Sequence, residues 1–322
     1  MLHSSVLVMG GSGFIGGHLV AELAAGGRRV LVPTRNPMGA ARRLLPLPTV
    51  EVIEADIHRD EELRPMIAGV EAVINLVGIL HGRQGRPWGP EFESAHVRLP
   101  ERVASACAAA RVPRLLHMSA LGVVEGGESS APSMYLRSKA AGERKVRESG
   151  LPGWTIMRPS VVFGPDDRFL NLFASLQRRL PVLAVGRAEA RFQPVYVADV
   201  AAAFVSALDT PQTHHRCYEL AGPEVFTLRE LIGIAGDLAG RRRPVIGLPD
   251  GLGRLQASLL EHLPGRTLMS RDNFDSMSID NVASKPTAAE LQLHPSSIAA
   301  VAPQWNTGRN ARVGEARMRA GR

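Results

Sequence analysis

Six short apolar runs, separated by helical stretches, dominate the first half of the chain. The runs are rich in Val, Ile and Leu, which is typical of parallel strands buried on both faces. They lie at residues 6–9, 29–33, 50–54, 72–77, 115–118 and 154–157. Between several of them the residues favour helix, most clearly in the alanine-rich segment 100–111. This order predicts an α/β fold with a doubly wound parallel sheet.

A glycine-rich turn directly follows the first predicted strand. Residues 10–16 read Gly-Gly-Ser-Gly-Phe-Ile-Gly, and Ile15, Leu19 and Leu23 then follow at helical spacing. Glycines let the backbone approach a pyrophosphate, while free N–H groups and the positive dipole end of the next helix attract it. Strand, glycines and helix together predict a dinucleotide site in a Rossmann-type sheet; both Gly-x-Gly-x-x-Gly and Gly-x-x-Gly-x-x-Gly spacings fit.

The second predicted strand indicates which dinucleotide binds. NAD sites usually place a carboxylate on the ribose about 20 residues beyond the glycines, but residues 23–50 contain no Asp or Glu. Thr34 and Arg35 stand at the end of that strand, and Arg42 and Arg43 follow. Arginine pairs well with a 2′-phosphate. We therefore expect NADP(H) in preference to NAD(H), with a solvated basic helix start as the alternative interpretation.

The regular alternation ends near Asp166, beyond which prolines interrupt the chain repeatedly. We expect residues 1–165 to form the dinucleotide-binding domain, completed by residues 193–222. Residues 166–302 are expected to form a smaller, mixed domain over the carboxyl edge of the sheet, where such folds bind substrates. Residues 303–322 lack apolar periodicity and read as a basic, disordered tail.

Composition excludes several classes of function. The formal net charge is +7, but residues 306–322 hold five arginines against one glutamate and so account for +4 of it. The other 305 residues carry only +3, so a general nucleic-acid binder is not expected. Cys107 and Cys217 are the two cysteines, which suits a reducing compartment and no thiolate metal site. Residues 1–5 carry no basic region and the apolar run after them is too short for a signal segment, so none is expected, and no run of 18 apolar residues occurs. We expect a cytoplasmic protein without a transmembrane segment.

A leucine stripe between residues 252 and 263 follows the basic triplet 241–243 and predicts an amphipathic helix. Such a helix can lie on another subunit or on a membrane surface, which would place the chain peripherally at the inner face of the membrane. It can equally close the core of its own domain. We favour the core, since most amphipathic helices face one.

Tyr135 and Lys139 are four residues apart, so on a helix they share one face. A nearby ammonium group lowers the pKa of a phenol and fits it for proton transfer. Lys139 can also hydrogen-bond the cofactor ribose, and Ser119, just after the fifth strand, can orient a substrate oxygen. These three are the candidate catalytic residues for a small-molecule substrate that the sequence does not identify.

These motifs, in this order, resemble the short-chain dehydrogenase/reductase superfamily in its extended and atypical, epimerase/dehydratase-like branches. Asp56 matches the adenine-contacting aspartate, segment 75–78 the cofactor motif of strand four, and segment 158–165 the stretch that passes the nicotinamide. No residue cluster indicates a metal, and none is assigned. The resemblance implies cofactor contacts from Gly10, Gly13, Phe14, Ile15, Gly16, Thr34, Arg35, Asp56, Ile57, Leu76, Val77, Gly78, Lys139, Pro159 and Val162.

A narrower similarity is to bacterial relatives of the NADPH-binding accessory subunit of respiratory complex I. It implies a retained nucleotide site and association with a respiratory complex or with quinone metabolism. In that family the retained Tyr and Lys can serve to hold the cofactor alone. The segments that carry the similarity are 75–80, 135–139, 167–171, 193–197 and 270–273.

Two residues raise alternatives within this resemblance. His96 stands where extended members commonly carry an asparagine, and it can be a hydrogen-bond partner, a proton relay or a packing residue. Arg191 matches a position where epimerases often hold a substrate phosphate, or it can pair with Asp199 on the surface. His117, inside the fifth strand, reads as a core histidine with its hydrogen bonds satisfied.

Three functions remain open. The first is an NADP(H)-dependent oxidoreductase acting on a carbonyl, alcohol or quinone-type group, with Tyr135 as acid or base. The second is a non-catalytic NADPH-binding assembly or accessory protein of a complex I-like assembly. The third is a sugar-nucleotide epimerase or dehydratase, which the missing carboxylate disfavours because those enzymes more often use NAD. The first two need the same cofactor contacts.

Overall fold

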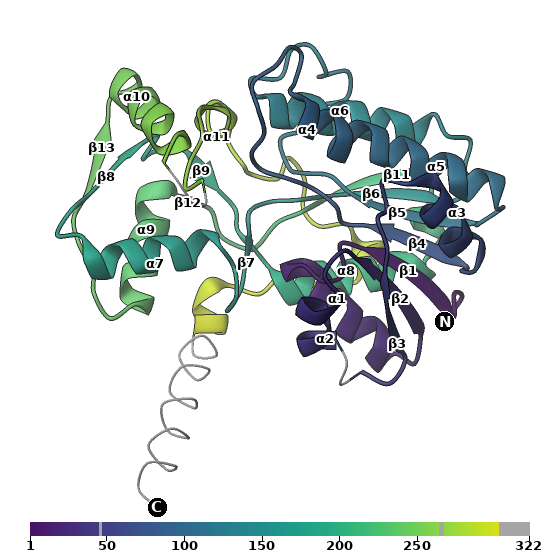
Figure 1. Cartoon of the computed structure of the whole chain (residues 1–322). Coiled ribbons are helices and arrows are strands. Elements are labelled where there is room, and N and C mark those ends of the chain that lie inside the picture. The colour runs from purple at the N-terminus through teal and green to yellow at the C-terminus, as the bar shows by residue number, and fades with distance from the viewer. Residues whose placement is uncertain (45–46, 264–266, 303–322) are drawn as a thin grey trace, which may run out of the picture.

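Seven parallel strands form the sheet of the larger domain (Figure 1). Their order is β11-β6-β5-β4-β1-β2-β3, so the winding direction reverses between β1 and β4. The six expected strands are all present, each within two residues of the predicted bounds, and the predicted α/β fold is confirmed. The strands are β1 (Ser5–Met9), β2 (Arg29–Thr34), β3 (Val50–Glu54), β4 (Ala72–Asn75), β5 (Arg114–Met118), β6 (Trp154–Pro159) and β11 (Arg216–Leu220).

The structure is a computed structural model, and it describes residues 1–44, 47–263 and 267–302. The side chains of Arg42 and Arg43 lie outside the described part of the chain. The same holds for the whole of the basic tail expected over residues 303–322.

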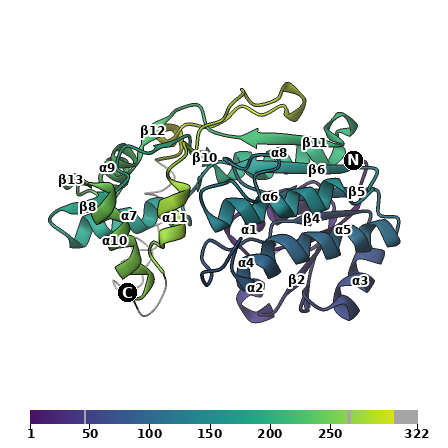
Figure 2. The ribbon, with the colours of Figure 1, turned by 90° about the horizontal axis from the view of Figure 1, so that it is seen from above.

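Helices cover both faces of the sheet (Figure 2). Along β1, Val6 and Val8 point into one core and Leu7 and Met9 into the other, as strand geometry requires. Because both faces are covered, the strands read as unbroken apolar runs. One face carries α1 (Phe14–Ala25), α2 (Pro37–Leu44) and α8 (Val197–Asp209). The other carries α3 (Asp60–Ala68), α5 (Leu99–Ala109) and α6 (Met134–Arg147).

Two short elements lie between β4 and α5. The helix α4 (Pro90–Phe92) runs into η1 (Glu93–Arg98), a stretch of π-helix, and α5 follows without a break. Such π-segments are rare and often mark functional sites. Here the segment contains His96, which it places on the side that packs against α6.

The seventh strand, β11, comes from the second half of the chain and pairs in parallel with β6. Its sequence, Arg-Cys-Tyr-Glu-Leu, has no apolar run, which is why it was not among the predicted strands. In β11, Tyr218 and Leu220 are buried. Together with α8, this strand brings residues between 193 and 222 back into the larger domain.

Much of the remaining second half forms the smaller domain, on the left in Figure 1, whereas Leu291 packs in the core of the larger domain. The smaller domain has an apolar core of its own that includes Leu170, Leu231 and Ile232. Its helices are α7 (Phe169–Arg179), α9 (Leu228–Leu238), α10 (Asp250–Glu261) and α11 (Arg271–Ser276). Short strands complete it or connect it to the larger domain: β7 (Val162–Phe163), β8 (Leu183–Gly186), β9 (Arg191–Phe192), β10 (Val195–Tyr196), β12 (Phe226–Thr227) and β13 (Val245–Leu248). Single-turn helices η2 (Pro211–Thr213) and η3 (Ala289–Leu291) lie in the remaining connections.

Helix α10 is the amphipathic helix expected between residues 252 and 263. Its buried positions are Gly253 and Ala257, which pack on other elements of the small domain. The interpretation that its leucine stripe closes the domain core is wrong, because most of the leucines face outward. Between 53 and 64% of the surface is exposed at Leu252, Leu255, Leu259 and Leu263. Within the described residues, no helix is both long and apolar enough to cross a membrane.

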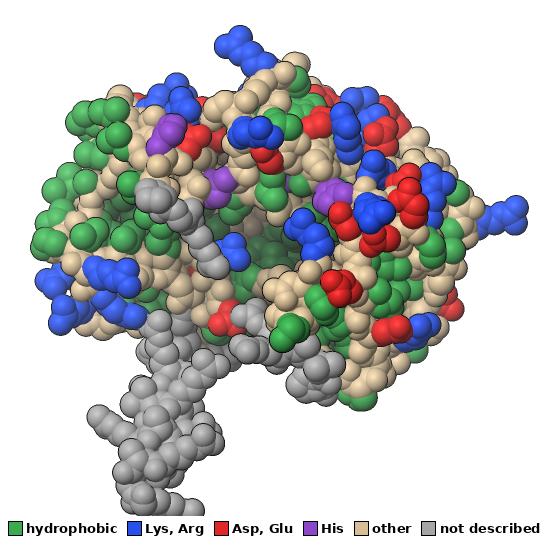
Figure 3. All heavy atoms as spheres, in the orientation of Figure 1, with side chains coloured by type: hydrophobic (Ala, Val, Ile, Leu, Met, Phe, Trp, Pro, Cys, Tyr) green, Lys and Arg blue, Asp and Glu red, His purple; other side chains and the backbone are tan. Residues whose placement is uncertain are grey.

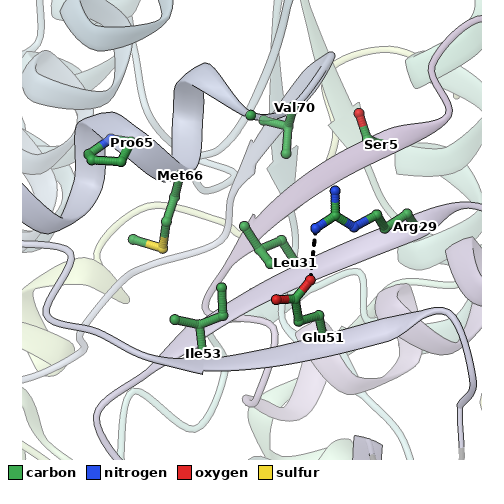
Figure 4. A pocket seen from close by; sticks show the side chains of 9 residues that line it. Ser5, Arg29, Leu31, Glu51, Ile53, Pro65, Met66 and Val70 are labelled. Carbon is green, nitrogen blue, oxygen red and sulfur yellow. Dashed lines mark hydrogen bonds and ion pairs between the residues drawn. The ribbon is translucent and has the colours of Figure 1, made fainter.

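A pocket of about 270 Å³ opens between α3 and strands β2 and β3 (Figure 4). Leu31, Ile53 and Met66 line it, and the ion pair between Arg29 and Glu51 lies beside them at 2.8 Å. Arg29 and Glu51 stand at the amino ends of their strands. Parallel α/β sheets bind ligands at the carboxyl ends, so the candidate site lies elsewhere.

Candidate functional site

The glycine turn after β1 leaves an anion-binding helix end open. Gly10 has φ +79°, a left-handed conformation that favours glycine. A Cβ on Gly16 would lie 2.2 Å from the Gly10 carbonyl oxygen, so a side chain cannot fit there. Gly13 caps α1 and supplies no side-chain acceptor to its first turn. The N–H groups of that turn are therefore available to a phosphate.

The second and third strands end beside one another, where an adenosine ribose binds in such folds. Arg35 is exposed just beyond β2, and Thr34 Oγ1 accepts the Asn36 N–H at 3.2 Å. Asp56 follows β3 and accepts the His58 N–H at 3.0 Å, which fixes its carboxylate in a turn; Ile57, next to it, is half-buried. The sequence places no carboxylate at the end of β2.

Three predicted cofactor segments meet at the carboxyl edge of the sheet. A Cβ on Gly10 would lie 3.3 Å from the carbonyl carbon of Leu76, so the β1 turn runs against the end of β4. Val77 is fixed there by its N–H, which donates to Asn75 Oδ1 at 3.1 Å. A Cβ on Gly78 would lie 3.1 Å from Lys139 Nζ. Glycine at position 78 therefore lets the β4 end approach α6.

Other predicted contacts come from the next segment of chain. Pro159 ends β6, and Val162, half-buried, begins β7. The ring of Phe14 at the start of α1 lies under Gly164, where a Cβ would be 3.1 Å from it. Ile15 packs against the core beneath α1. The structure thus brings segment 158–165 to the glycine turn.

The candidate catalytic residues gather where β5 ends and α6 begins. Lys139 is only 3% exposed, and its Nζ donates to the Met118 carbonyl oxygen at 3.0 Å. Ser119 comes next in the chain; its Oγ is buried and has no hydrogen-bond partner among the described residues. Tyr135 is half-buried, with its ring centroid 6.5 Å from that of Phe92. A substrate oxygen can satisfy the Ser119 hydroxyl.

Burial controls the proton affinities of both titratable groups. It lowers the pKa of Lys139 to about 8, against the opposing effect of the Glu143 charge. Burial, with the charge of Asp272, raises the pKa of Tyr135 to about 12. At neutral pH Tyr135 is therefore a protonated phenol, which suits a proton donor.

His96 connects the β4 end to α6 through both ring nitrogens. Its Nε2 accepts the Ile79 N–H at 3.0 Å, which requires the ring proton on Nδ1, and Nδ1 lies 2.9 Å from Ser138 Oγ. Ser138 in turn donates to the Tyr135 carbonyl oxygen at 2.9 Å. Burial, followed by the charge of Lys139, holds the pKa of His96 well below its usual value. Of the three roles considered, the structure shows the hydrogen-bond partner.

His117 is buried, as expected, but only one of its nitrogens is satisfied. Nδ1 lies 3.3 Å from Asn75 Nδ2, and the Asn75 amide is oriented by the Val77 N–H. Nε2 is buried without a partner in the described structure, so the expected full satisfaction is wrong. Burial lowers the pKa of His117 to about 3, which keeps the ring neutral.

Two carboxylates of this region were not among the site residues predicted from the sequence. Glu143 is fully buried one turn beyond Lys139 and binds Arg158 through both oxygens, at 2.7 and 2.6 Å, and Arg147 at 2.7 Å. Asp272, from α11, accepts two backbone N–H groups at the start of α6. The spacing of Glu143, four residues after Lys139, was the available sign of the first. Asp272 lies in segment 270–273, which carried the narrower similarity, but its contact with α6 is visible only in the tertiary structure.

Arg191 lies apart from this cluster. It is exposed and 3.7 Å from Asp280, whereas Asp199 accepts hydrogen bonds from Ser296. Of the two alternatives for Arg191, the pair with Asp199 is therefore wrong, and the phosphate-binding role is not tested by these contacts. Figure 3 shows that the surface is hollowed between the two domains, with hydrophobic side chains in its floor and Lys or Arg side chains beside it.

Comparison with known sequences identifies the family to which this chain belongs. The model of the NAD dependent epimerase/dehydratase family matches residues 6–221. The chain belongs to this family. It therefore binds a nicotinamide dinucleotide, NAD or NADP, at a Rossmann-type sheet.

Several relatives carry names from respiratory complex I. NADH dehydrogenase [ubiquinone] 1 alpha subcomplex subunit 9 of Arabidopsis thaliana is 33% identical over 86% of this chain and 70% of the relative. The mouse subunit of that name is 34% identical over 70% of this chain, and the match spans only 58% of the mouse protein. Ceramide reductase of Caulobacter vibrioides is 32% identical over 76% of this chain and 74% of the relative. The family thus includes complex I subunits and oxidoreductases.

Solved structures confirm the two-domain fold. UDP-glucuronic acid 4-epimerase of Bacillus cereus, solved with UDP-glucuronic acid and NAD, superposes with a TM-score of 0.68. It is 20% identical and covers 94% of this chain and 99% of its own. UDP-glucose 4-epimerase of Thermus thermophilus, solved with NAD, gives a TM-score of 0.61 at 22% identity, covering 85% of this chain and 99% of its own.

Proposed function

We propose that this chain is an NADP(H)-dependent oxidoreductase that acts on a carbonyl, alcohol or quinone-type group. The observation that carries the proposal is the placement of Lys139. Its buried ammonium group lies between the Met118 carbonyl and Gly78, one helical turn from Tyr135. The strand ends, the glycine turn and the first turn of α6 thus face one region, as a nicotinamide ring and a substrate oxygen would require.

In this proposal each site residue of the chain has a separate role. The nucleotide, when bound, supplies or accepts the hydride. Tyr135 donates a proton to the substrate oxygen in the reducing direction, and Ser119 orients that oxygen. Lys139 holds the ribose and stabilises negative charge on Tyr135 after the proton has left. Gly10, Gly13 and Gly16 hold the pyrophosphate.

The proposed preference for NADP(H) depends on the end of β2. Arg35 is exposed there, and the strand ends without a carboxylate that would repel a 2′-phosphate. Replacing Arg35 by alanine should weaken NADPH binding at least tenfold and leave NADH binding within twofold. Equal losses for the two nucleotides would overturn the assignment of Arg35.

A second function, a nucleotide-binding accessory protein without turnover, has its own support. The raised pKa of Tyr135, about 12, opposes formation of the tyrosinate that alcohol oxidation needs. Several relatives are subunits of a respiratory complex by name. In this alternative Tyr135 and Lys139 hold NADPH, and the partner is a complex I-like assembly. The epimerase alternative rests on the family and the fold.

The deciding experiment purifies the protein with NADPH and measures nucleotide oxidation with carbonyl and quinone substrates. The oxidoreductase proposal expects turnover that falls at least 100-fold in Tyr135→Phe with NADPH affinity retained. NADPH that stays bound and unreacted in wild type and variant alike would favour the accessory protein. Interconversion of UDP-sugars without net nucleotide oxidation would favour the epimerase.

A matched glycine pair tests the nucleotide site itself. Gly16→Ala places a Cβ against the Gly10 carbonyl oxygen, whereas a Cβ on Gly17 meets nothing within 4 Å. We expect Gly16→Ala to abolish NADPH binding and Gly17→Ala to retain it, as measured by NADPH fluorescence. Equal affinities in the two variants would overturn the placement of the nucleotide at this turn.

A further inference from the structure

Helix α6 receives a cap from the other domain. Ser133, its own N-cap, accepts the Leu136 N–H at 3.2 Å. Asp272, on α11 of the smaller domain, accepts the N–H groups of Met134 at 2.6 Å and Tyr135 at 3.1 Å through its two oxygens. Asp272 is 5% exposed. A buried carboxylate from a distant segment thus completes the first turn of the helix that carries Tyr135 and Lys139.

The same segment also contacts the chain that follows Gly78. Asn273 Nδ2 donates to the Leu80 carbonyl oxygen at 3.3 Å, and Ser270 Oγ lies 3.4 Å from His81 Nδ1. Ser276 Oγ donates to Ser133 Oγ at 2.8 Å. Helix α11 therefore binds both sides of the candidate site, the β4 end and the start of α6.

We propose that Asp272 is a positioning residue that couples the smaller domain to the first turn of α6 and keeps the Tyr135 hydroxyl in place as a proton donor. The inference rests on the proposed function, in which Tyr135 donates the proton. Asp272 binds the backbone N–H of Tyr135, so the position of α11 bears directly on the helical turn that carries the tyrosine.

The charges around Tyr135 agree with this role. The Asp272 carboxylate raises the pKa of Tyr135 in the same direction as burial does. Lys139 lies on the same helix, and the neutral His96 faces the Tyr135 ring at 5.5 Å between centroids. Burial raises the pKa of the Asp272 carboxyl; its two backbone hydrogen bonds and the charge of Arg137 oppose this, and the charge of Asp275 adds to it. Asp272 thus favours the protonated phenol, which is the form that gives a proton to a carbonyl oxygen.

Tyrosine titration tests the proposal without any turnover. The chain has three tyrosines, so ¹³Cζ-tyrosine NMR resolves them, and Tyr135→Phe identifies the signal of Tyr135. Asp272→Asn keeps an acceptor oxygen and removes the charge, and Asp272→Ser does so with a smaller side chain in case the amide disturbs folding. We expect both to give a several-fold larger tyrosinate fraction at Tyr135 between pH 10 and 11 than wild type.

Asp275→Asn is the matched control. Asp275 lies on the same helix and carries the same charge, but it pairs with Arg254 and makes no hydrogen bond to α6. It should leave the Tyr135 titration unchanged. A wild-type titration in Asp272→Asn and Asp272→Ser, or an equal shift in the Asp275 control, would overturn the role of Asp272.

Kinetics separate this inference from the proposed function. Where wild type reduces a carbonyl substrate, Asp272→Asn should lower kcat severalfold at neutral pH and keep NADPH affinity within twofold, because Tyr135 is protonated in both proteins at that pH and only its placement changes. If wild type turns over no substrate, the oxidoreductase proposal fails while the titration still decides the charge effect of Asp272 on Tyr135.

Discussion

Helix α6 buries two charged side chains, Lys139 and Glu143, whereas helix α10 leaves Leu252, Leu255 and Leu259 exposed. Hydrophobicity alone would place these residues the other way round. The difference lies in what surrounds each helix. α6 packs against α5, η1, the sheet and α11, whereas α10 contacts α11 and β8. A side chain is buried when other elements cover it, and charge is then tolerated only with partners.

The two helices also differ in how they are packed. On α6 the buried charges have partners from other elements, Met118 on β5 and Arg158 on β6. On α10 the packed face is narrow: Gly253 approaches Gly186 and the ring of Phe274. Small residues let the helix approach its neighbours closely, and the large residues then remain outside. Four substitutions test this contrast.

Removing the buried carboxylate of α6 should have the largest effect. Glu143→Ala leaves Arg147 and Arg158, both largely buried, without their shared partner. We expect the free energy of unfolding to fall by about 3–5 kcal/mol, because an uncompensated buried charge remains. Guanidinium denaturation measures it. Glu148→Ala is the control: Glu148 is the exposed C-cap residue of α6 and pairs with Arg144, and its loss should change little.

The pH dependence of stability tests the burial of Lys139. Its pKa is lowered in the fold to about 8 from 10.5, so between these values the unfolded chain binds more protons and stability rises with pH. Relative to Lys139→Met, wild type should gain on the order of 2 kcal/mol between pH 7 and 10. Denaturation curves at several pH values measure the difference. A flat difference would show that the ammonium group is solvated.

The packed face of α10 offers a matched glycine pair. A Cβ on Gly253 would lie 2.8 Å from the Gly186 Cα and from the Phe274 ring, whereas one on Gly251 meets nothing within 4 Å. We expect Gly253→Ala to lose about 1–2 kcal/mol of stability through overpacking. Gly251→Ala should be neutral or slightly stabilising, since alanine favours helix. Equal effects in thermal unfolding would contradict the close approach.

The leucine stripe of α10 should show the smallest effect. Leu255 is 55% exposed, so Leu255→Ser should change the free energy of unfolding by less than about 0.5 kcal/mol. Denaturation of the purified protein, together with its size by gel filtration, provides the test. A loss of more than about 2 kcal/mol would mean that another surface covers the stripe in solution.

Much of the larger domain followed from local sequence. The apolar runs at 29–33 and 50–54 predicted β2 and β3 because a strand buried on both faces needs no polar alternation. The glycines of residues 10–16 predicted the turn, and the structure gives the reason for glycine at position 16, where there is no room for a Cβ. β11 was not predicted because its five residues contain no apolar run, and they form a strand by pairing with β6.

The candidate site was predictable in part. Tyr135 and Lys139 were predicted from their four-residue spacing, and Gly78 from the resemblance of segment 75–78 to a cofactor motif. The structure brings Gly78 and Lys139 together. The role of His96 was left open because a histidine has two nitrogens and its tautomer depends on neighbours that lie 17 and 42 residues away, Ile79 and Ser138. Asp272 lay in a segment of the narrower similarity, 270–273, but its role in capping α6 could not be predicted, since its partners lie 138 and 137 residues earlier.

The sequence by itself determined the parallel sheet and the glycine turn, because backbone geometry and strand burial act over a few neighbouring residues. Only the tertiary structure decided which charged groups are buried with partners, as Glu143 is, and which leucines stay outside, as Leu255 does. Burial depends on elements far away in the chain. For the same reason, the cap that Asp272 provides to α6 could not be predicted locally, because it joins segments of the two domains that lie far apart in the sequence.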